Sequence, residues 1–193
     1  SIYNVPGSQY YWSIYINQGS GDIPTGSTWG GWCIDSQKGI GSGTYTFPVY
    51  SSLNINAASP AYLQTINWNK INYVINHKSK ANNNMQAIQA AIWHYDGGIP
   101  SSTHAYDSWF TSPDYFALIA AADANPSYLP GPGEKYGVIF YLVGYQGLMI
   151  EVPIPDVPVP EFPILAVPAI FIISAIYLVT HIIKKVFQLD TNP

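Results

Sequence analysis

The chain has 193 residues, enough for one sizeable domain, and only 9% of them are charged while 15% are aromatic. Its seven basic residues, all lysine, form no basic patch that would neutralise a run of phosphates. We therefore expect no nucleic acid partner.

The start of the chain and its cysteine content bear on its cellular compartment. Cys33 is the only cysteine, so no internal disulfide forms. The sequence begins at Ser1, and no charged segment followed by an apolar stretch precedes the domain. We expect this of a mature exported chain from which a signal peptide has been removed.

Residues 1–153 combine short strand patterns with turns rich in glycine, proline, serine and asparagine. Strands are predicted at residues 10–16, 29–34, 43–50, 137–143 and 148–152. Helical periodicity predicts helices at residues 68–76, 85–95 and 113–125. Asn84 is placed to cap the second of these helices. We therefore predict an α+β fold, a β-rich ectodomain of sandwich or barrel form with inserted helices.

The C-terminal part carries a membrane signal. Residues 164–183 contain no Asp, Glu, Lys or Arg, and as a helix they match the hydrocarbon core of a bilayer. Lys184 and Lys185 follow at once, which favours a cytoplasmic C-terminus. We predict a proline-rich stalk at residues 154–162, a transmembrane helix at 163–185 and a cytoplasmic tail at 186–193. The expected location is the cell surface, with the ectodomain outside and membrane lipid as one partner.

Pro160, Glu161 and Phe162 stand directly before the apolar segment, and the lysine pair closes it. This tripartite pattern resembles the PEF-type C-terminal sorting signals of archaeal surface proteins. The resemblance implies an archaeal source and display at the cell surface. The chain departs from the pattern because residues 186–193 continue past the basic pair.

Gln89 is the most informative residue after Cys33. On a helix it shares a face with Met85 and Ile92, so its carboxamide is expected to point into the core. A buried amide that lacks hydrogen-bond partners costs about 1 to 3 kcal/mol. Its placement among apolar residues therefore indicates a specific partner.

Several segments follow one another along the chain: Gly31-Trp32-Cys33-Ile34-Asp35, Val49-Tyr50-Ser51-Ser52, residues 71–75, Ile88-Gln89-Ala90-Ala91-Ile92-Trp93 and Pro130-Gly131-Pro132-Gly133. In that order they resemble the Cys-Gln thioester domains of surface adhesins, and the match spans most of residues 1–153. The chain has Ile88 where the helix motif of the family has threonine. The resemblance implies that Cys33 and Gln89 join side chain to side chain in a thioester.

The chemistry of such a bond is that of an activated acyl group. The Cys33 thiolate attacks the side-chain carbonyl of Gln89 and expels ammonia, which leaves an acyl group more electrophilic than an amide. A partner's amine or hydroxyl then takes that group in a single-use attachment. Neighbouring tryptophans, Trp29 among them, are expected to exclude water, and His94 or Asp96 to transfer protons. The expected supporting residues are Trp32, Asp35, Trp93 and His94.

The sequence thus predicts a membrane-anchored adhesion protein that acylates a surface protein or glycan. The alternative is a structural subunit of an extracellular lattice, sheath or membrane-protein complex without thioester chemistry, since low charge and many tyrosines and asparagines suit self-assembly. A third hypothesis is a cysteine hydrolase built from Cys33, His94 and either Asp35 or Asp96. The sequence carries no hydrolase signature, so we do not expect an enzyme that turns over a substrate. His77, His94 and His104 match no short ligand motif, so neither a metal nor a cofactor is expected.

Overall fold

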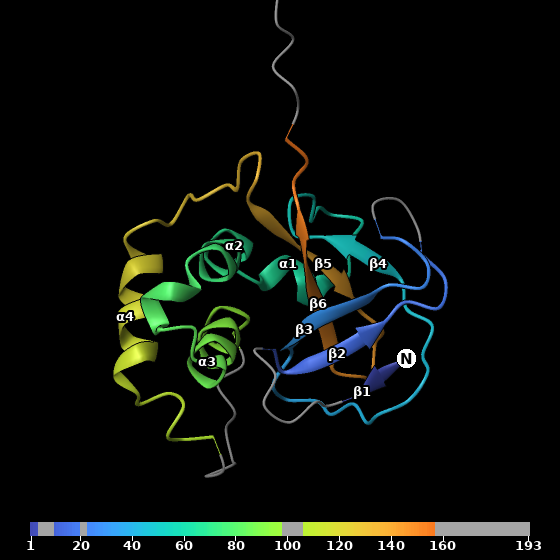
Figure 1. Ribbon diagram of the computed structural model, residues 1–193, viewed down its shortest axis with the longest axis horizontal. Helices are drawn as coiled ribbons and strands as arrows, with labels where there is room; N and C mark the ends of the chain where they lie inside the picture. Colours follow the sequence, from blue (N-terminus) through green and yellow to red (C-terminus); the bar gives the residue numbers. More distant parts are fainter. Residues whose placement is uncertain (4–9, 20–22, 98–105, 157–193) are drawn as a thin grey trace, which may run out of the picture. The chain divides into compact units, whose positions relative to one another are not determined.

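The computed structural model describes residues 1–3, 10–19, 23–97 and 106–156 (Figure 1). Ser1–Pro155 form one compact unit, and the elements below belong to it. The predicted transmembrane helix, the cytoplasmic tail, the pattern at Pro160 to Phe162 and the stalk beyond Asp156 lie outside the described residues. Within the described ranges, no helix is both long and apolar enough to cross a bilayer.

The described strands form one antiparallel sheet in the order β1-β2-β3-β6-β5-β4. They are β1 (Ile2–Tyr3), β2 (Trp12–Tyr15), β3 (Thr28–Ile34), β4 (Val49–Ser51), β5 (Lys135–Phe140) and β6 (Gly147–Pro153). The central strands β3 and β6 place Cys33 opposite Leu148. Because side chains alternate along a strand, Trp32 and Ile34 face one side of the sheet and Cys33 the other.

The helices lie to one side of the sheet (Figure 1). They are α1 (Ala61–Thr65), α2 (Trp68–Asn76), the 3-10 helix η1 (Lys78–Ala81), α3 (Met85–Tyr95) and α4 (Pro113–Asp123). Helix α3 packs against β3 and α2 against β5, while α4 packs on the outer side of α2 and α3. The predicted cap is confirmed, since the side chain of Asn84 accepts hydrogen bonds from the backbone N–H groups of Gln86 and Ala87.

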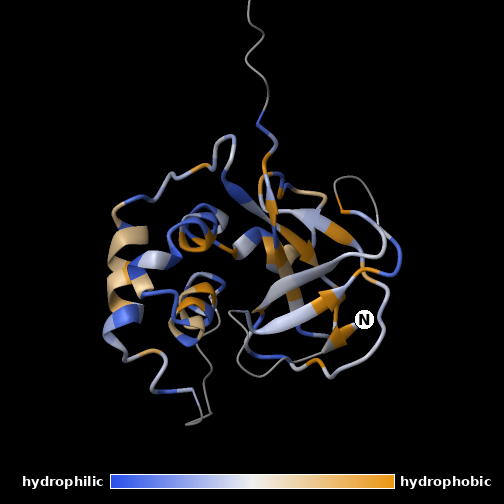
Figure 2. Cartoon of the chain, in the orientation of Figure 1, coloured by the Kyte–Doolittle hydropathy of each residue, from blue (hydrophilic) through white to orange (hydrophobic). Residues whose placement is uncertain are grey.

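Both faces of the sheet are apolar, so the domain has two cores; Figure 2 shows apolar residues along the strands and on α3. The helix-side core joins the sheet to the helices and includes Trp32, Ile34, Ile71, Ile88, Ile92, Ile139 and Met149. The sulfur-side core contains Trp12, Cys33, Trp93, Val138, Phe140, Leu148 and Ile150, with the partly buried Ile40, Tyr45 and Phe47 packed against it. Cys33 and Gln89 therefore lie where strand β3 meets helix α3.

The predicted α+β class is confirmed, but the sandwich or barrel form was wrong for the residues that the structure describes. The sheet has two free ends, β1 and β4, so it does not close into a barrel. Its second layer is helical, because Ile71, Ile88 and Ile92 present apolar side chains to Trp32 and Met149 of the sheet. A sheet face covered in this way has no need of a second sheet.

Candidate functional site

The carboxamide of Gln89 pairs with the backbone of Cys33. The backbone N–H of Cys33 donates to Oε1 of Gln89 at 2.9 Å, and Nε2 of Gln89 donates to the carbonyl oxygen of Cys33 at 2.8 Å. Both residues are fully buried. The structure thus brings together the two residues that the sequence singled out, one from β3 and one from α3.

The end of the β2–β3 pairing explains why Gln89 reaches the backbone of Cys33. The described pairing of β2 with β3 ends where Trp12 lies opposite Gly31, two residues before Cys33. On that edge of β3 the carboxamide of Gln89 supplies one donor and one acceptor, as a peptide group of a neighbouring strand would. As a result, a backbone N–H points at the carbonyl oxygen that would gain negative charge during nucleophilic attack.

The sulfur of Cys33 lies in the sulfur-side core, where Nε1 of Trp12 donates to Sγ at 2.8 Å. Burial raises the pKa of the Cys33 thiol, the hydrogen bond from Trp12 opposes that effect, and the charge of Asp96 adds to the rise. The resting thiol is therefore neutral at physiological pH. Such a buried thiol is shielded from reagents in solution, and the backbone of the same residue carries the carboxamide of Gln89.

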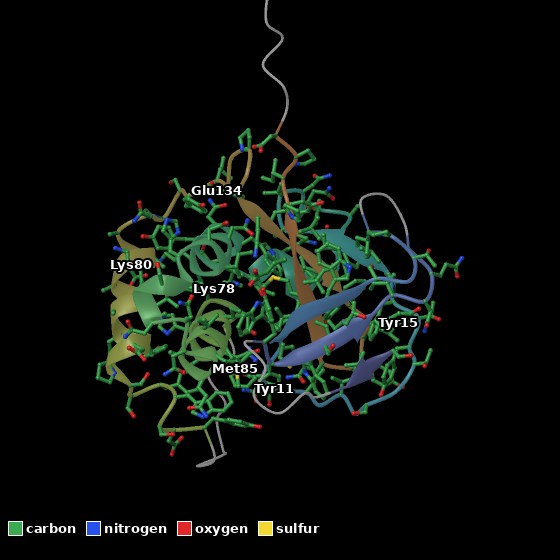
Figure 3. All side chains as sticks on the ribbon, viewed as in Figure 1. Tyr11, Tyr15, Lys78, Lys80, Met85 and Glu134 are labelled. Carbon is green, nitrogen blue, oxygen red and sulfur yellow. The ribbon has the colours of Figure 1, made fainter. Side chains whose placement is uncertain are left out.

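Aromatic rings pack around Cys33 and Trp93. Trp93, one helical turn after Gln89, stacks on Trp109 with ring centroids 6.1 Å apart and meets Tyr11 edge-on at 5.9 Å. The hydroxyl of Tyr11, a residue labelled in Figure 3, is 3.3 Å from that of Tyr106. The indole N–H of Trp93 is buried, with no hydrogen-bond partner among the described residues. These rings limit the access of water to the sulfur.

Asp35 and Asp96 fasten the end of β3 to the end of α3. The backbone N–H of Asp35 donates to Oδ2 of Asp96 at 2.7 Å, and both residues are buried. The carboxylate of Asp35 pairs with Lys38 at 2.7 Å, and its backbone is left-handed, with φ of 67°. The carboxylate of Asp96 therefore holds the backbone in place two residues after Cys33. The carboxylate of Asp35 instead contacts Lys38 and the backbone N–H of Gln37.

Trp32 points away from the sulfur and belongs to an ion network, around the buried carboxylate of Glu151, that sequence reasoning missed. Glu151 lies at its centre and accepts from Nε1 of Trp32 at 2.8 Å. Lys78, labelled in Figure 3, reaches both oxygens of Glu151 at 2.7 Å, and Lys135 reaches one at 2.9 Å. Burial lowers the pKa of Lys135, but the hydrogen bond and charge of Glu151 raise it overall. The sequence signal was an acidic residue within an otherwise apolar strand.

His94 lies on a different side of α3 from Gln89. Five residues separate them, which corresponds to a rotation of about 140° around the helix. Nδ1 of His94 is 2.9 Å from the hydroxyl of Tyr115 in α4, and burial lowers the pKa of His94. The structure therefore does not bring His94 to Cys33, and both the expected proton transfer and the hydrolase hypothesis lack their histidine.

The structure gives no sign of a metal centre in the ranges it describes. No three His, Cys, Asp or Glu side chains gather there in a way that would hold an ion. His77 stacks on Tyr73 with ring centroids 3.9 Å apart, and His104 lies outside the described residues.

Comparison with known proteins does not assign the chain to a family. No protein-family model matches the chain, and no curated protein matches it. Among solved structures, the chain is similar to the N-terminal domain of the Streptococcus pyogenes pilus tip adhesin Cpa. The two are 12% identical, the match covers 80% of this chain and 99% of that one, and the TM-score is 0.41.

Proposed function

We propose that this chain is a surface-displayed attachment protein in which Cys33 and Gln89 form an internal thioester. The observation that carries the proposal is the pair of reciprocal hydrogen bonds between the carboxamide of Gln89 and the backbone of Cys33, at 2.9 and 2.8 Å. A reacting group held in this way meets its partner without the entropy cost of a bimolecular encounter.

The closing step needs no reagent from outside. The sulfur of Cys33 attacks Cδ of Gln89, the Sγ–Cδ bond forms, the Cδ–Nε2 bond breaks, and the thiol proton leaves with the nitrogen as ammonia. The backbone N–H of Cys33 donates to the oxygen of Gln89 as that oxygen gains negative charge. The aromatic rings around Trp93 keep out water, which would hydrolyse the product.

The loaded chain then acylates its partner. An amine nitrogen of the partner attacks Cδ of Gln89, the Sγ–Cδ bond breaks, and a proton from the amine passes to the sulfur. The product is an amide between Gln89 and the partner, and a hydroxyl would give the corresponding ester. Each chain reacts once, so the activity is attachment and not turnover, and it requires neither a metal nor a cofactor.

Attachment of this kind fits display outside the cell. The transmembrane helix predicted at residues 163–185 would hold the domain at the surface, with residues 186–193 in the cytoplasm. The partner would then be a protein or glycan of a neighbouring surface. Anchoring in lipid would keep the attached partner on the cell.

Capture of methylamine tests the proposal. After treatment of the purified 193-residue chain and digestion, we expect a methylamide at Gln89 and an equal amount of free thiol at Cys33. The variant Cys33→Ala should capture none. Gln86 is exposed on the same helix and should stay unmodified in every sample.

The same experiment distinguishes the other hypotheses. An unmodified Gln89, with a free thiol at Cys33 before treatment, would contradict the thioester and favour the structural subunit. Sustained turnover of a peptide or ester by the same sample would instead favour the hydrolase.

A further inference from the structure

Trp12 contacts the sulfur atom on which the proposed chemistry depends. Its Nε1 lies 2.8 Å from Sγ of Cys33, in a contact between two buried side chains. Trp12 lies opposite Gly31 in the β2–β3 register, and Cys33 is the next residue on the same face of β3. Two paired strands therefore hold this donor in place.

The sulfur needs such a donor at two moments. When the thiol loses its proton to attack Gln89, negative charge develops on Sγ. When a partner's amine later opens the thioester, the sulfur leaves as a thiolate and carries that charge again. An anion in an apolar core has no water to stabilise it, so a nearby N–H has a large effect.

We propose that Trp12 is a catalytic residue of the Cys33–Gln89 thioester, whose indole N–H stabilises the sulfur anion as nucleophile and as leaving group. The inference rests on the proposed function. Each atom that gains negative charge then has its own hydrogen-bond donor. The backbone N–H of Cys33 donates to the oxygen of Gln89, and the indole N–H of Trp12 donates to the sulfur. No further reactant is needed, because the thiol proton departs with ammonia and the amine proton returns to the sulfur.

The environment of the sulfur supports this role. Burial raises the pKa of the Cys33 thiol, and the hydrogen bond from Trp12 is the contact that works against the rise. A phenylalanine at position 12 would fill much of the same space without offering a donor. Loss of the N–H therefore separates the effect on the sulfur from the effect on packing.

The variant Trp12→Phe provides the test, with Trp68→Phe as its matched control. Trp68 also donates an indole hydrogen bond of 2.8 Å, but to the backbone carbonyl of Leu63 in the helix-side core. We expect methylamine to open the thioester of Trp12→Phe at least about tenfold more slowly than that of the wild type, because hydrogen bonds to charged groups are strong. Trp68→Phe should open at the wild-type rate.

A second readout isolates the effect on the sulfur. After methylamine has opened the thioester, the pH dependence of alkylation of the released Cys33 thiol should move to higher pH in Trp12→Phe only. A purely structural role of Trp12 would not displace this profile.

The outcomes separate this inference from the proposed function. Suppose that the wild type forms the thioester, and that the thioester of Trp12→Phe opens at the wild-type rate with an unchanged pH profile of alkylation. This result overturns the role of Trp12 and leaves the proposed thioester intact. If instead the intact mass of the wild type is not one ammonia below its sequence mass, no thioester has formed. That result overturns both the proposed function and the role of Trp12, and it needs no Trp12 variant.

Should Trp12→Phe fail to fold, the indole N–H resonances of a chain with isotope-labelled tryptophan decide the matter. The resonance of Trp12 should shift in the variant Cys33→Ala, while that of Trp68 stays in place. An unmoved resonance of Trp12 would overturn the contact with the sulfur.

Discussion

Gln89 completes the hydrogen bonding of Cys33 as a neighbouring strand would, with bonds of 2.9 and 2.8 Å to its backbone N–H and carbonyl. The described strand β2 pairs with β3 only as far as Gly31. Without Gln89, the polar backbone groups of Cys33 on that edge would be buried and unpaired. One side chain therefore stabilises the fold and supplies the carbonyl for the proposed chemistry.

Replacement of Gln89 should destabilise the domain even where no thioester forms. In a Cys33→Ala background, Gln89→Ala leaves a backbone N–H and a carbonyl unpaired in the core and creates a cavity. We expect the free energy of unfolding to fall by about 2 to 5 kcal/mol, measured by urea unfolding. In the same background Gln86→Ala, at an exposed position of the same helix, should change it by less than about 0.5 kcal/mol. Equal losses in the two variants would contradict the pairing.

The ion network around Glu151 should contribute strongly to stability. Glu151→Gln removes the charge that Lys78 and Lys135 share, and those lysines keep some contact with water. We expect a loss of about 2 to 4 kcal/mol in the free energy of unfolding, near the lower end of the cost of breaking a buried ion pair.

The exposed ion pair between Lys70 and Asp123 is the control for Glu151. Their atoms are also 2.7 Å apart, but the side chain of Asp123 is 50% exposed. Asp123→Asn should cost less than about 1 kcal/mol. A Glu151→Gln variant as stable as Asp123→Asn would show that burial does not strengthen the network.

The lowered pKa of His94 predicts a loss of stability in acid. Burial lowers this pKa in the folded chain, although the charge of Asp123 partly opposes it, while in the unfolded chain the pKa is about 6.5. The unfolded state therefore takes up a proton first as the pH falls. The contribution of neutral His94 to the free energy of unfolding is therefore complete above about pH 6.5. It is lost as the pH falls below that value towards the pKa of His94 in the folded chain.

Urea unfolding at about pH 7.5 and about pH 5.5 checks the sign of this effect. The free energy of unfolding of the wild type should fall more between the two values than that of His94→Gln. Parallel losses in both proteins would assign the acid sensitivity to other groups.

The longer helices of this fold were predictable because the helical spacing of apolar residues can be read from a short stretch of sequence. The predicted residues 68–76 and 85–95 coincide with α2 and α3, and α4 ends at Asp123, two residues before the predicted end. Asn84 and Ser112 mark two of the starts with side-chain caps. Helix α1 was missed because five residues are too few to show a period.

The sheet was harder to predict because pairing depends on distant segments. Residues 43–50 were expected to form one strand, but only Val49–Ser51 pair as β4, and Gly43 makes a single bridge to Ile2. Gly43 and Pro48 in this stretch interrupt regular pairing. The alternation of apolar residues along a strand indicates a buried face. It does not indicate whether helices or a second sheet cover that face.

The candidate site was predictable only in part. The order of the motifs pointed to Cys33 and Gln89, whereas Trp12 reaches the sulfur through the β2–β3 register, which no local pattern reveals. His94 was assigned by its closeness in sequence to Gln89, and the rotation of the helix separates the two.

The intact mass of the untreated 193-residue chain tests the central claim most directly. Closure of the Cys33–Gln89 thioester releases ammonia, so the wild type should be one ammonia lighter than its sequence requires, and Cys33→Ala should have its full sequence mass. A wild-type chain at full sequence mass, with Cys33 open to alkylation after unfolding, would contradict the bond.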